Sequence, residues 1–110
     1  MRSYLIDEIG EEDVKRLHRY LSAKAVPSGV EGLFWVEFGP SLLTPLQQEH
    51  LPCHPHVFAV ELGSKNLKAE FFLRTMKDMR CSCQGYCTPA QAHYIIGWIN
   101  DMLQELSIRT

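Results

Sequence analysis

The chain lacks any apolar run of the length that a membrane-spanning helix needs, about 18–20 residues. Its N-terminal stretch, MRSYLIDEIGEED, has no apolar core of the kind found in signal peptides and becomes acidic at once. We therefore expect a cytoplasmic protein, in a compartment that keeps thiols reduced.

Motifs of common enzymes and nucleic-acid-binding proteins are also missing. The sequence has no glycine-rich phosphate loop, no dinucleotide-binding fingerprint, no C-x-x-C and no C2H2 or aromatic-basic RNA-binding pattern. The formal net charge is -2, so a strongly basic surface is not expected either. These absences favour a non-catalytic protein that acts through association with another protein.

What the sequence does contain fits one ordinary domain over residues 1–110. Hydrophobic residues make up 45% and charged residues 22% of the 110 positions, enough to build a core without disulfide bonds. No internal repeat, low-complexity segment or linker interrupts the chain.

Helical patterns stand near both ends. Residues 11–25 carry apolar side chains at helical spacing and acidic residues in the first turn. Residues 89–106 follow Thr88 as N-cap, with proline at the first helical position and Gln91 at capping-box spacing. The same signals at Thr44 predict a short helical turn.

Alternating patterns predict about four strands, at residues 32–38, 56–62, 67–74 and 79–84. Short connections favour antiparallel pairing. The sequence therefore predicts a two-layer α+β domain, with an antiparallel sheet and the N- and C-terminal helices packed on one face.

Cysteine and histidine gather at two places. Cys81, Cys83 and Cys87 lie within seven positions, and Cys53 stands in CHPH. Spacing allows a Cys3His metal set, for which zinc is the fitting ion, made of Cys53, His56, Cys81 and Cys83.

The sequence favours the alternative that Cys81 and Cys83 are buried thiols without a cofactor. In an extended strand, Cys87 would lie about 20 Å from Cys81, so all three sulfurs could not converge. A thiol-redox protein using the same residues is a further alternative.

Cys87 is the candidate catalytic residue. It directly precedes the N-cap Thr88, and a helix N-terminus stabilises a thiolate. The competing interpretation is a packing contact with Ala92 across the helix start.

Two surfaces suggest partners. Residues on the sheet face opposite the helices form an apolar set that predicts a partner surface, most simply in a homodimer: Leu33, Trp35, Val57 and Phe72. The alternative to a partner is a cover over this face, formed by residues 4–6 or 40–52 of the same chain.

A set of basic residues supports a second alternative for the function, an anion- or nucleic-acid-binding accessory protein: Lys65, Lys68, Arg74, Lys77 and Arg80.

The stretch RCSCQGYCTPAQ, residues 80–91, resembles a family of small uncharacterised bacterial proteins of about this length. The resemblance implies a bacterial source. It implies no activity or ligand.

Overall fold

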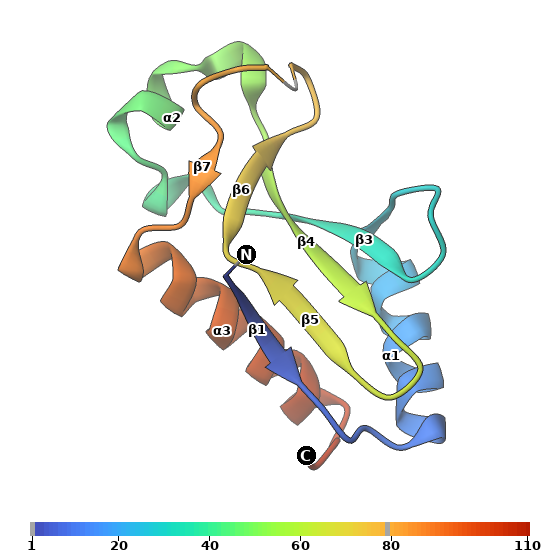
Figure 1. Cartoon of the computed structure of the whole chain (residues 1–110). Helices are drawn as coiled ribbons and strands as arrows, with labels where there is room; N and C mark the ends of the chain where they lie inside the picture. Colours follow the sequence, from blue (N-terminus) through green and yellow to red (C-terminus); the bar gives the residue numbers. More distant parts are fainter. Residues whose placement is uncertain (1, 79) are drawn as a thin grey trace.

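The computed structural model describes residues 2–78 and 80–110 and shows an α+β fold. Its sheet is antiparallel throughout the described residues, and three α-helices accompany it (Figure 1). The α-helices are α1 (Glu11–Lys24), α2 (Pro45–Glu49) and α3 (Pro89–Glu105). The strands are β1 (Ser3–Ile6), β2 (Val26–Pro27), β3 (Leu33–Glu37), β4 (His56–Leu62), β5 (Leu67–Glu70), β6 (Phe72–Thr75) and β7 (Gly85–Tyr86). Two short 3-10 helices, η1 (Pro40–Leu42) and η2 (Leu51–Cys53), flank α2.

Capping explains where the predicted helices begin. Both α2 and α3 start with a complete capping box, in which Thr44 pairs with Gln47 and Thr88 with Gln91. In each box the threonine side chain accepts a hydrogen bond from the glutamine backbone N–H, and the glutamine side chain accepts one from the threonine N–H. The predictions of α1 and α3 are confirmed to within one residue at each end.

The sheet runs in the order β1-β5-β4-β3-β2, and β6 pairs with both β4 and β7. Strand β4 is the centre, since β5 pairs with its second half and β6 with its first. At the start of β3, Gly32 approaches this strand so closely that a Cβ would lie 2.7 Å from the carbonyl oxygen of Leu62. Only glycine fits there. The φ of Gly32 is also +81°, a value that favours glycine.

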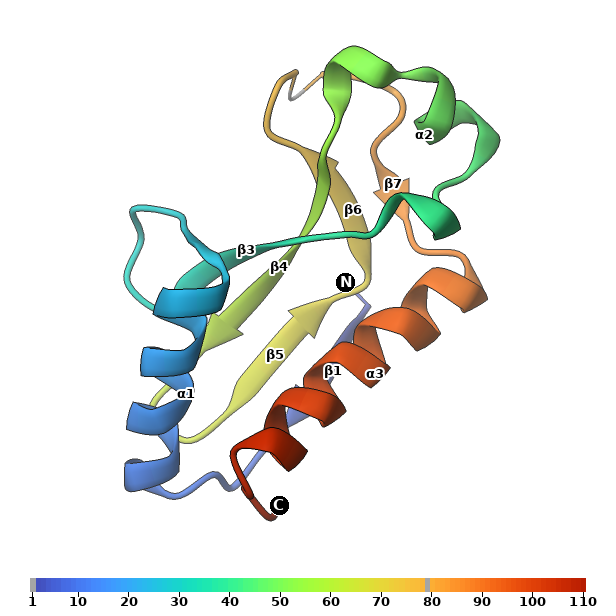
Figure 2. The same ribbon diagram turned by 180° about the vertical axis from the view of Figure 1, so that it is seen from behind.

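Helices α1 and α3 lie on the same side of the sheet, as the front and back views agree (Figures 1 and 2). The core lies between these two layers. Phe34, Phe58, Val60, Leu67 and Leu73 of the sheet are buried in it, whereas Phe71 packs against it and is only partly buried. From the helices it receives Leu17, Leu21, Ile95 and Ile99, all fully buried. Each such side chain contributes about 1.5–3 kcal/mol by leaving water.

The predicted number of strands is wrong: the described residues form seven strands rather than about four. Three of the additions, β1, β2 and β7, have two to four residues, too few for alternation to be recognised. The predicted strand at 67–74 is divided at Phe71 into β5 and β6, although its alternation is kept.

The predicted strand at residues 79–84 is also wrong. Met79 lies outside the described residues, and residues 80–84 form turns rather than a strand. This difference decides where the cysteines lie.

Candidate metal centre

Two segments far apart in the sequence meet beyond the start of β4. One runs from α2 through η2, and the other is the loop between β6 and β7; they lie beside each other in both views (Figures 1 and 2). We call these two segments, residues 44–56 and the described residues 76–78 and 80–86, the Cys/His lobe.

The first segment turns tightly because Pro52 stands in the first turn of η2. The backbone N–H of Cys53 donates to the carbonyl of His50 over 2.9 Å, which closes one 3-10 turn. Residues three positions apart lie on the same side of such a helix. The turn therefore places His50 and Cys53 together.

The second segment brings Cys81 and Cys83 to the same place by two consecutive turns. The Cys81 N–H donates to the carbonyl of Asp78 over 3.1 Å, and the Gln84 N–H donates to the carbonyl of Cys81 over 3.4 Å. Since the chain curls here, Cys81 and Cys83 converge on one point, whereas a strand would have lined them up along a face.

Four potential ligand atoms result, one each from His50, Cys53, Cys81 and Cys83, and all lie within 4.8 Å of one another. Nδ1 of His50 lies 3.0 Å from Sγ of Cys81. Cys53 and Cys83 are buried, and His50 and Cys81 are half-buried. All four cysteines of the chain are free thiols.

Buried hydrogen bonds fix the backbone around this cluster. The Gln47 amide donates to the carbonyl of Cys83 over 3.1 Å, and the Thr75 hydroxyl donates to the carbonyl of Cys53 over 2.6 Å. Gln91, at the start of α3, donates to Gln47 Oε1 over 3.0 Å. The capping residues of two helices thus also hold the loop that carries Cys83.

The structure replaces one member of the predicted metal set. His56 lies beside the cluster rather than in it, with Nε2 3.3 Å from Sγ of Cys83, and His50 takes the fourth position. His56 belongs to β4 and points to the helix side of the sheet, where it is completely buried. From this position His56 can orient the Cys83 sulfur.

The sequence contained a signal for His50, the ligand that the prediction missed. His50 and Cys53 have an H-x-x-C spacing across Leu51 and Pro52, and metal ligands are usually paired from such short turns. The C-x-x-H spacing of Cys53 and His56 was equally visible in the sequence. Only the fold shows which histidine converges with all three sulfurs.

The surroundings of the cluster thiols shift their pKa values in opposite directions. A hydrogen bond from the Cys83 backbone, together with those from the Cys83, His50 and Cys53 side chains, lowers the pKa of Cys81 to about 7. Burial, followed by the neighbouring Cys81 and Cys53, raises the pKa of Cys83 to about 12. Burial likewise raises the pKa of Cys53 and lowers that of His56.

In chelator-treated protein, an alkylating reagent should therefore react faster with Cys81 than with Cys83. The thiolate is the reactive form, so the rate at Cys81 should fall about ten-fold per pH unit below pH 7 and level off above it. Iodoacetamide labelling followed by peptide mass spectrometry measures this. Cys83, whose pKa is about 12, is the internal comparison. Equal labelling of both thiols at pH 7 would contradict the assignment.

Cys87, the predicted reactive thiol, is not part of the cluster. Burial is the main reason that the pKa of Cys87 rises to about 11, and the charge of Glu70 adds to the effect. Its side chain packs against the core. Desolvation outweighs the helix N-terminus here, so the geometry favours the packing interpretation.

The predicted basic set is spread along β5, β6 and the adjoining turns. Lys65 lies in the turn between β4 and β5, whereas Lys77 and Arg80 lie beyond the far end of β6. Arg74 pairs with Glu70 at 2.7 Å, and its guanidinium lies 4.8 Å from the centre of the Phe72 ring. These placements do not bring the five charges together.

Comparisons with protein-family models, curated proteins and solved structures gave no match to this chain. The bacterial resemblance of residues 80–91 accordingly stays a prediction. Among the described residues, no helix has both the length and the apolar character required to pass through a lipid bilayer.

Proposed function

We propose that this protein binds one Zn²⁺ ion through His50, Cys53, Cys81 and Cys83, as a structural metal centre. The observation that carries the proposal is the convergence of four ligand atoms within 4.8 Å. In a tetrahedral zinc site neighbouring sulfurs lie roughly 3.8 Å apart, since each Zn–S bond is about 2.3 Å. The side chains therefore need only small adjustments to reach that geometry.

The chemistry of the donors supports zinc. Three thiolates and one imidazole form a Cys3His set, which is a common structural zinc site. Soft sulfur donors disfavour Mg²⁺ and Ca²⁺, which take oxygen ligands. Four protein ligands would also fill the tetrahedral coordination sphere. A catalytic zinc needs an open position, so the set supports a structural role.

The role of the ion would be to join the two segments of the Cys/His lobe. Cys53 and Cys83 are buried but lie outside the main hydrophobic core between the sheet and the helices. The lobe is therefore stabilised by hydrogen bonds, including those from Thr75 and Gln91 outside it, and, on this proposal, by the metal. His56 would donate from Nε2 to the Cys83 thiolate, which orients the sulfur toward the ion.

Metal analysis of protein purified without chelator tests the proposal. We expect about one equivalent of zinc per chain by elemental mass spectrometry, and its loss in Cys81→Ser and His50→Ala. His93→Ala is the matched control, because His93 is exposed on α3 and outside the cluster. His56→Ala should weaken zinc binding by about 10–100-fold without abolishing it.

Metal-free protein that also fails to take up added zinc would contradict the proposal. Rapid disulfide formation between the cluster thiols in that protein would favour the thiol-redox alternative. Equal zinc content in His50→Ala and the unmodified protein would instead show that the ligand set is wrong.

A further inference from the structure

The sheet face opposite α1 and α3 carries a continuous set of side chains that the strand register defines. Directly opposite residues on neighbouring strands point to the same face. Trp35 lies opposite both Val26 and Ala59. In the next row, Leu33, Glu61, Lys68 and Leu5 follow one another across four strands.

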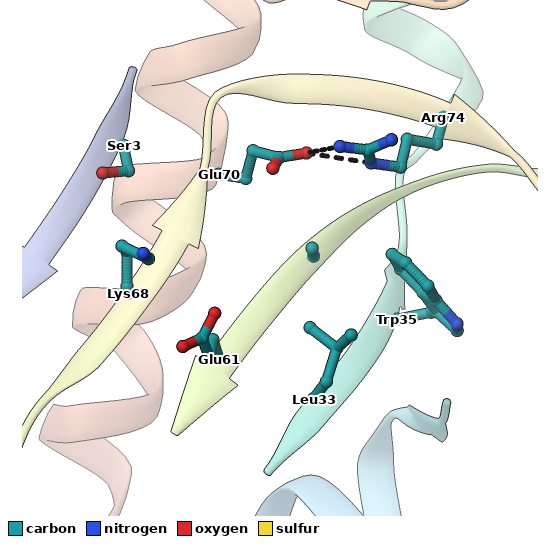
Figure 3. A pocket seen from close by; sticks show the side chains of 8 residues that line it. Ser3, Leu33, Trp35, Glu61, Lys68, Glu70 and Arg74 are labelled. Carbon is teal, nitrogen blue, oxygen red and sulfur yellow. Dashed lines mark hydrogen bonds and ion pairs between the residues drawn. The ribbon is translucent and has the colours of Figure 1, made fainter. Parts of the chain in front are cut away.

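This outer face is hollow at its centre. The hollow has a volume of about 340 Å³, and it lies over β3, β4 and β5 (Figure 3). Leu33, Trp35 and Ala59 form its apolar part. Its polar part is formed by Ser3, Glu61, Lys68, Glu70 and Arg74.

The segments that were expected as alternative covers lie elsewhere. The N-terminal residues extend the sheet as β1 beside β5, so they lie in its plane. Residues 40–52 are held at the other side of the molecule, where Gln91 of α3 donates to the carbonyl of Leu42 over 2.9 Å. Leu33, Trp35 and Phe72 accordingly stay partly exposed. The prediction of Val57 as part of the partner surface is wrong, because Val57 is buried, as is Ala59.

Large apolar side chains project beside the hollow, one from each edge of the face. Val26 on β2 is 57% exposed, and Leu5 on β1 is 53% exposed. Since they lie in the same rows as Trp35 and Lys68, they point to the same side as the hollow. The face thus combines a central depression with apolar projections, a shape that a second copy of the face can complement.

The charges favour a copy of the same chain over a charged partner. Around the hollow stand two acidic and two basic residues, and Arg74 donates to Glu70 over 2.9 Å (Figure 3). Opposite charges in equal number let a two-fold-related face meet acid with base, whereas a nucleic acid requires an excess of basic residues. An apolar centre within a charged margin is also typical of protein interfaces.

Association through the β2 edge of the sheet is less suitable than association through the face. The edge strand β2 has two residues, and the second is Pro27, which has no N–H to donate to an added strand.

We propose that the outer face is the interface of a homodimer, with Trp35 at its centre. The proposal does not depend on the metal centre, because none of its residues belongs to the Cys/His cluster. Trp35 suits the central position because tryptophan is enriched among the residues that dominate binding energy. In the dimer the Val26 and Leu5 side chains of each copy would cover apolar surface of the other.

Two valine substitutions provide a matched test. Val26→Glu places a charge on the outer face, and Val30→Glu places the same charge at a 64% exposed position in the turn after β2. Both positions are exposed, so both variants should fold like the unmodified protein. Sedimentation equilibrium from about 1 to 200 µM should show a dimer that Val26→Glu weakens at least about ten-fold, while Val30→Glu leaves its dissociation constant within about two-fold.

Trp35→Ala is the second variant, and it should weaken the dimer by at least about 30-fold, as expected for a central anchor. A monomer throughout this concentration range would overturn the proposal. A dimer equally sensitive to Val26→Glu and Val30→Glu would overturn it too, since the interface would then lie elsewhere.

Discussion

Removal of zinc should lower the melting temperature of the zinc-loaded protein by about 15 °C or more. A ligand that binds only the folded state stabilises by about 4 kcal/mol when it is present at 1,000 times its dissociation constant. Each kcal/mol corresponds to about 4–8 °C in a domain of this size. Calorimetry or circular dichroism with and without a chelator measures the shift.

Cysteine substitutions provide the control for this prediction. Cys53→Ser should remove the chelator-dependent shift, because Cys53 supplies one of the four converging atoms. Cys87→Ser should keep the shift, since Cys87 lies outside the cluster, although its contact with the core gives that variant a lower starting stability. A shift that survives in Cys53→Ser would locate the stabilising metal elsewhere.

Ile99→Asp should unfold the domain at room temperature. Ile99 is fully buried on α3, in the core between the helices and the sheet. An unpaired carboxylate there loses its hydration, and its burial costs several kcal/mol in addition to the loss of the apolar side chain. Domains of this kind are stable by about 5–15 kcal/mol in total, so little or no stability remains.

Two further variants on α3 show whether burial is the cause. Ile99→Ala removes the same apolar group without adding charge and should cost about 2–5 kcal/mol, leaving a folded protein. Gln104→Asp adds the charge at an exposed position of the same helix and should change stability by about 0.5 kcal/mol or less. Chemical denaturation followed by circular dichroism compares the three. An unchanged denaturation midpoint in Ile99→Asp would show that this face of α3 is not buried.

Local signals predicted the helices because a helix is specified by residues close in sequence. Thr88 is the N-cap of α3, Pro89 is its first residue and Gln91 is its third, and the structure confirms each of them. The core strands were equally readable, since buried residues such as Phe34 and Val36 alternate with half-buried neighbours along β3.

The short strands could not be predicted, because they are specified by their partner strands rather than by residues close in sequence. β2 consists of Val26 and Pro27, and it exists because β3 offers a partner, not because two residues have a pattern. The run from Met79 to Gln84 illustrates the opposite error. Its alternation predicted a strand, but turns anchored by Asp78 and Cys81 replace it over the described residues 80–84.

The sequence by itself determined the α+β class, the capped helices and the core faces, and it offered Cys53, Cys81 and Cys83 as candidate ligands. Local capping, periodicity and the count of sulfur-bearing residues suffice for these features. Only the tertiary structure decided that His50 rather than His56 converges with all three sulfurs, and that Cys87 stays apart. Ligand convergence depends on how segments about 30 residues apart in sequence approach each other, and buried contacts such as Gln47 to the Cys83 carbonyl set that approach.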